Sequence, residues 1–172
     1  MPSSSALAPS VARSGRPRWQ RGIRLLERLR RRRPAPVRLP RPAQVRALLA
    51  VLDEAVAAQQ PADAAVAACG EPGPVPGRAA RACGDASSAL LHLRARLREL
   101  LLTDIDLVQA RAYAGRLLAY HQWMVRQSAN LAYTGHPDAR TEAARLQLNG
   151  LGRPADELRR LRDVLKEQQR AP

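Results

Sequence analysis

Phenylalanine is absent from the chain, and only five of its 172 residues are aromatic. Isoleucine occurs twice and valine ten times, whereas alanine occurs 32 times and leucine 25 times. Because β-branched and aromatic residues favour strands while alanine and leucine favour helices, this composition argues against a β-rich fold. We therefore expect an all-α protein, a bundle of three to five helices, whose core is thin because alanine buries little area.

Long apolar runs and a secretory signal are also missing from the sequence. No run of about 18 apolar residues is present, so we expect no membrane-spanning helix. Cys69 and Cys83 are the only cysteines, 14 positions apart across a loop rich in proline and glycine. We expect both to be reduced in a cytoplasmic protein, since a disulfide would need an oxidising compartment.

Motifs for catalysis and cofactor binding are missing as well. The sequence has no glycine-rich phosphate loop, no dinucleotide-binding turn and no serine elbow. His92, His121 and His136 lack the spacing of helical metal sites, and the two cysteines lack zinc spacing. We therefore expect a non-enzymatic protein without a cofactor or a metal, in which His121 is a core histidine bonded to a neighbour.

Acidic residues are scarce at the N-terminus, where residues 1–41 hold 12 arginines and a single acid, Glu27. This segment carries +11 of the chain's net charge of +14, whereas residues 42–172 hold 17 basic and 14 acidic residues. We predict a basic arm and linker over residues 1–41 and one helical bundle domain over 42–172. Within the arm, we expect disorder over residues 1–16 and a helix over 17–33, followed by a proline-rich linker.

Concentrated positive charge attracts polyanions, and arginine forks suit phosphates. We therefore expect the arm to bind nucleic acid through its phosphates with weak sequence preference. Two alternatives stay open: residues 17–33 lie on an anionic membrane surface, or the arm is a dispensable leader and translation starts at Val37 or Val45. The predicted phosphate-binding residues are Arg18, Arg21, Arg24, Arg28, Arg30, Arg31, Arg32 and Arg33.

Helix boundaries in the bundle follow from the apolar periodicity and from proline and glycine. Asp85 is the expected cap of the helix that begins between residues 78 and 86, and Thr103, with Asp106 three positions later, that of the next helix. Pro61 is expected to break the first helix of the bundle. The predicted helices cover residues 43–59, 62–69, 78 or later to 102, 104–133, 138–148 and 154–168.

The helix predicted over residues 104–133 carries the longest apolar seam, which consists of Leu107, Ala110, Ala114, Leu117, His121, Met124, Ser128 and Leu131. Four of the five aromatic residues also lie on this helix, and tyrosine and tryptophan are enriched in recognition surfaces. The alternative function is therefore protein interaction, in which another helical protein or a second copy docks on this helix. The predicted contact residues are Tyr113, Tyr120, Trp123 and Met124.

The last two predicted helices have the outline of a helix–turn–helix unit, with arginines on the second helix. Their connection is longer than the tight turn of that motif needs, and residues 154–168 carry four acids that phosphate would repel. We expect a plain, solvated helical hairpin.

Overall fold

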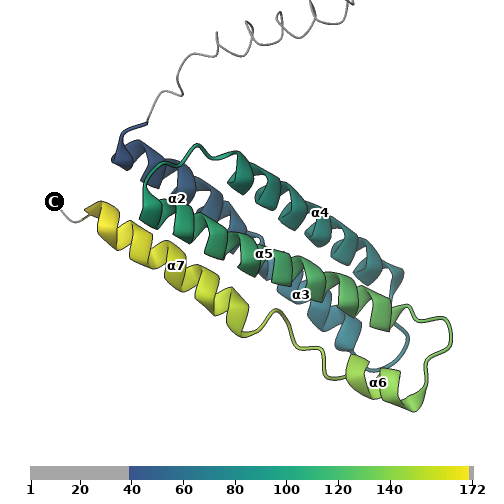
Figure 1. The fold of residues 1–172 in the computed structure, drawn as a ribbon. Helices are drawn as coiled ribbons and strands as arrows, with labels where there is room; N and C mark the ends of the chain where they lie inside the picture. Colours follow the sequence, from purple (N-terminus) through teal and green to yellow (C-terminus); the bar gives the residue numbers. More distant parts are fainter. Residues whose placement is uncertain (1–38, 171–172) are drawn as a thin grey trace, which may run out of the picture. The chain divides into compact units, whose positions relative to one another are not determined.

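The computed structural model describes residues 39–170, so every prediction for residues 1–38, including those for the arm arginines, lies outside the described residues. Within this part of the chain all regular structure is helical, which confirms the all-α prediction. The bundle has five helices if the adjacent α2 and α3 are counted as one bent helix (Figure 1). The helices are α2 (Arg41–Ala57), α3 (Gln59–Gly70), α4 (Gly77–Glu99), α5 (Ile105–Ala132), α6 (Ala139–Arg145) and α7 (Arg153–Arg170).

The expected break in the first helix is present, because Ala58 separates α2 from α3 and Pro61 lies in the first turn of α3. Proline fits that turn, where its missing N–H would have no intrahelical partner. Both α2 and α3 pack against α4 and α5. The bend therefore lets one stretch of chain follow the α4–α5 pair along its length.

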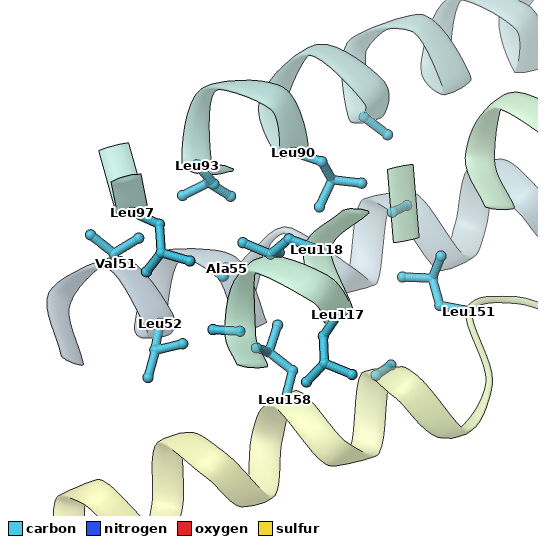
Figure 2. Packing of buried hydrophobic residues seen from close by; sticks show 14 of the residues in the cluster. Val51, Leu52, Ala55, Leu90, Leu93, Leu97, Leu117, Leu118, Leu151 and Leu158 are labelled. Carbon is cyan, nitrogen blue, oxygen red and sulfur yellow. The ribbon is translucent and has the colours of Figure 1, made fainter. Parts of the chain in front are cut away.

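Helix α5 is the centre of the domain and contacts each of the other five helices. Leu118 points toward Leu90 of α4, and Leu117 points toward Leu158 of α7 (Figure 2). The predicted seam is confirmed as the inward face, since Leu107, Ala114, Leu117, His121 and Ser128 are buried. The domain's own helices therefore cover this seam, which leaves no apolar stripe there for a partner.

Two predicted caps differ from the structure. Helix α4 begins at Gly77, directly after the extended Pro76, and runs through Gly84 and Asp85 without interruption. The cap of α5 is Asp104, whose Oδ1 accepts a hydrogen bond from the Asp106 backbone N–H at 3.2 Å. Thr103 does not cap α5 because its hydroxyl and backbone N–H are engaged by Gln44 of α2.

Gln44 is a buried polar residue, 3% exposed, that joins the start of α2 to the loop before α5. Its Nε2 donates to the Leu39 carbonyl at 2.7 Å and to the Thr103 hydroxyl at 3.0 Å. Its Oε1 accepts from the backbone N–H of Thr103 at 2.7 Å and of Asp104 at 3.3 Å. Arg41 forms an ion pair with Asp104 beside it. The folded domain thus includes residues 39–41, which we had assigned to the arm.

Candidate nucleic-acid interface

The four predicted interaction residues of α5 do not form one surface. Tyr120 and Trp123 are 42% and 52% exposed, and their ring centroids lie 5.6 Å apart with the planes tilted by 38°. Tyr113 is half-buried and donates its hydroxyl hydrogen to Glu157 of α7, while Met124 packs partly buried against the core. Only Tyr120 and Trp123 therefore present an aromatic surface to solvent.

The hydrogen bond between Tyr113 and Glu157 fixes the position of the tyrosine ring. That bond, followed by burial, raises the pKa of the Tyr113 hydroxyl, and the same bond lowers the pKa of Glu157. The Arg116 guanidinium lies over the ring, 5.4 Å from its centroid. Tyr113 therefore helps to place a guanidinium group on α5.

An arginine-lined groove begins between α4 and α5 and continues along the face of α5 beyond Arg94, and we call it the α4–α5 groove. It consists of two adjoining hollows of about 430 Å³ and 390 Å³, which share Arg94 and Ala119. No acidic side chain is among the residues that line either hollow. The arginines that line it are Arg94, Arg98, Arg111, Arg116 and Arg126.

Small residues on α5 leave room for this groove. Ala112, Gly115 and Ala119 follow one another at spacings of three and four, so they lie on one face of the helix. A Cβ atom placed on Gly115 would lie 3.8 Å from Leu97 of α4, which forms part of the groove floor. Because glycine and alanine side chains are this short, the surface between the flanking arginines is recessed.

The groove arginines differ in how firmly the domain holds them. Arg94 donates to the Gln122 side-chain oxygen at 2.6 Å, and Arg111 donates to the Leu100 carbonyl at 2.8 Å. Neither is paired with a carboxylate among residues 39–170, so each keeps its net charge. Arg98, Arg116 and Arg126 are exposed. The groove therefore combines two hydrogen-bonded guanidinium groups with three on exposed residues, of which Arg116 also lies over the Tyr113 ring.

The arginines of α7 are engaged differently. Arg159 donates to the Gln59 side chain at 2.9 Å and pairs with Asp156 at 2.7 Å. Arg162 pairs with Asp163 at 2.7 Å. Acidic residues of α7 itself therefore neutralise Arg159 and Arg162. Seven residues connect α6 to α7. The expected solvated hairpin is not formed, however, because α6 packs on α5 while α7 packs on α2 and α5 and buries Ala155, Leu158 and Leu165.

His121 is fully buried, and neither of its ring nitrogens has a hydrogen-bond partner. The predicted core position is confirmed, but the Pro154 backbone, which lies near the imidazole, does not meet hydrogen-bond geometry with it, so the expected bond to a neighbour is not formed. Burial lowers the pKa of the imidazole, and Arg159 lowers it further, while the Pro154 backbone and the charge of Asp63 act in the opposite direction. The imidazole is therefore held in its neutral form.

Cys69 and Cys83 are free, buried and adjacent, with their sulfur atoms 3.6 Å apart. Burial, followed by the effect of Cys69, raises the pKa of the Cys83 thiol to about 12. This thiol is thus a poor nucleophile at neutral pH. Across residues 39–170, no group of three or more histidine, cysteine or acidic side chains is arranged to hold a metal ion.

Our reading of the sequence missed the α4–α5 groove, although its elements are visible there. Arg94 and Arg98 are four positions apart and so share a face of α4. Arg111 and Arg116 flank the small residues of α5. The sequence does not show that α4 and α5 pack side by side, nor that the arginines of both helices then border the same solvent-exposed surface.

The chain matches no known protein-family model, no curated protein and no solved structure. Among the helices of residues 39–170, none combines the length and the apolar character needed to cross a membrane. What the protein does must therefore be inferred from its own charges and surfaces.

Proposed function

We propose that this protein is a non-enzymatic nucleic-acid-binding protein whose arginine-rich arm contacts phosphates with weak sequence preference. The observation that carries the proposal is the charge of residues 1–41, which contain 12 arginines and one acidic residue. Neutralising phosphates with arginine releases the counterions that surround a nucleic acid. Binding of this kind is strongly salt-dependent and needs no base contacts.

The folded domain adds positive charge of the same kind in the α4–α5 groove. Its five lining arginines occur without an acidic side chain among the lining residues. This separation of charge is notable in a domain whose basic and acidic residues are nearly balanced over 42–172. A polyanion is the partner class that both features favour.

The test is binding of fluorescent 20-nucleotide single-stranded DNA, RNA and duplex DNA by the full chain, at about 50 and 200 mM salt. The arm variant replaces Arg30, Arg31, Arg32 and Arg33 by glutamine. The matched control replaces four exposed arginines of the domain by glutamine: Arg46, Arg78, Arg81 and Arg140.

We expect the full chain to bind all three ligands and the arm variant to bind them more weakly than the control. If all four arm arginines contact phosphates, the slope of log affinity against log salt should fall by about 3 for single strands. The absence of binding at the lower salt concentration would refute the proposal. Equal weakening of the arm variant and the control would refute the role of the arm.

Self-association is a second candidate function, favoured by exposed apolar side chains at one end of the bundle. Leu101 and Ile105 flank the cap of α5 and are 68% and 66% exposed. Covering such side chains in a dimer would remove apolar area from water. Sedimentation velocity over a concentration series should then show a dimer that Leu101→Ser with Ile105→Ser dissociates, whereas a monomer at all concentrations would exclude it.

A further inference from the structure

We infer that the α4–α5 groove is a binding site for one strand of nucleic acid, with phosphates along its arginines and a base stacked on Trp123. This inference rests on the proposed function and adds a second, structured site to the arm. It also specifies the ligand as a single strand rather than a duplex.

Charge is the first argument for this site. Five guanidinium groups line the groove, and each can present paired N–H donors to a phosphate. Arg94 and Arg111 are held by neutral oxygen acceptors of the domain, at 2.6 and 2.8 Å, so these bonds orient them without cancelling their charge. On α7, by contrast, Arg159 and Arg162 face carboxylates.

The dimensions of the groove are the second argument. From Arg111 to Asn130 the lining residues follow α5 for 19 positions, which corresponds to about 28 Å of helix. On α4 only Arg94, Leu97 and Arg98 line the groove, so the remainder of this length is the open face of α5. A surface of that length can hold several nucleotides, and known single-strand sites cover about 4–16 nucleotides. Because α4 and α5 pack directly on each other, the groove is a depression on their shared surface. A single extended strand can follow such a depression with its phosphates on the arginines and its bases free to stack, which the paired bases of a duplex are not.

An aromatic platform is the third argument. Trp123 lines the second hollow, is 52% exposed, and has Tyr120 5.6 Å away. Base–aromatic stacking does not depend on sequence, because every base has a π-face, and it contributes about 1–3 kcal/mol per base. Gln122, Gln127 and Asn130 line the same hollow and supply amide groups for base edges or phosphates. A basic groove with an exposed aromatic side chain thus combines the two elements by which proteins hold single strands.

The groove variant carries Arg98→Gln, Arg116→Gln and Arg126→Gln, which removes the three exposed charges and keeps the two anchored arginines. The matched control carries Arg46→Gln, Arg81→Gln and Arg140→Gln, three exposed arginines that do not line the groove. Both are made in the full chain and titrated with a 20-nucleotide deoxythymidine oligomer at about 0.1 M salt.

We expect the groove variant to bind the oligomer at least about tenfold more weakly than the control, with a salt slope reduced by about 2. The difference between variant and control should shrink for a duplex of equal length. If the groove variant and the control bind the oligomer equally, the inference is wrong.

A second measurement reports on the groove directly. Trp19 and Trp123 are the only tryptophans of the chain, so Trp19→Phe leaves Trp123 as the sole tryptophan. The oligomer should quench the emission of Trp123 in this variant, and the same quenching should be lost when the groove substitutions are added.

The two proposals fail in different ways. If the oligomer binds and the arm variant weakens binding, but Trp123 emission does not change, the arm is the whole site and the groove inference falls alone. If the full chain binds no nucleic acid, the proposed function and the groove inference fall together. A single-tryptophan protein whose emission is quenched even after the arm arginines are replaced would support the groove as an independent site.

Discussion

Replacing His121 by leucine is expected to stabilise the domain. The imidazole is 0% exposed, and both of its nitrogens lack hydrogen-bond partners. Leaving a buried polar group unsatisfied costs about 1–3 kcal/mol. Leucine is close to histidine in volume and has no polar atom, so His121→Leu should raise the free energy of unfolding by about that amount at pH 7.

The same substitution should change how stability depends on pH. Because the pKa of His121 is lowered in the folded state, mainly by burial, the unfolded chain binds a proton that the native domain excludes. Stability should fall as the pH drops below about 6.5, with a slope of at most about 1.4 kcal/mol per pH unit from this one group. The carboxylate of Asp104, whose pKa is lowered mainly by its hydrogen bond with Arg41, loses its contribution only below about pH 4.

Urea denaturation of the wild type and of His121→Leu at several pH values between about 5 and 8 tests both points. The exposed His136 provides the control as His136→Gln. We expect the two stability curves to diverge toward acid, with the leucine variant higher throughout. A leucine variant that is less stable than the wild type at pH 7, or that loses stability equally between pH 7 and 5, would refute the reasoning.

Four further predictions concern packing and accessibility. Gln44→Ala removes four hydrogen bonds from a buried site and should destabilise the domain by about 2–4 kcal/mol in urea, whereas the exposed Gln109→Ala should have little effect. Gly84→Ala should raise stability by about 1 kcal/mol, because no atom lies within 4 Å of the added Cβ in the interior of α4. Gly70→Ala should lower stability by about 1–3 kcal/mol, because its Cβ would lie 2.5 Å from a backbone oxygen. Ellman's reagent should find no reactive thiol in the native protein and two per chain after unfolding, since both cysteines are buried.

The long helices were predictable because their signals are local and periodic. Helix α5 was expected over residues 104–133 and spans Ile105–Ala132, and its inward face follows the seam from Leu107 to Ser128. The break near Pro61 was equally predictable, since proline acts on its own backbone. In a sequence of this composition, the all-helical fold class and the buried face of a long helix can therefore be predicted.

The errors came from contacts between residues distant in the sequence. Thr103 has the right type and spacing for a cap, but Gln44, 59 positions earlier, occupies its polar groups. Gly84 resembles a helix boundary, yet α4 continues through it because its neighbours Ala79, Cys83 and Ala86 are buried against the bundle. The missing partner of His121 and the open side of the α4–α5 groove also depend on tertiary packing.

The central position of α5 has a consequence for how the domain comes apart. Each of the other five helices packs on it, so the release of any of them exposes part of the same buried face. Partly folded forms in which one helix has detached are therefore high in free energy, and the domain should unfold as one cooperative unit. Amide hydrogens in the middle of α5 should exchange with solvent only through that global opening, at a rate set by the stability of the whole domain.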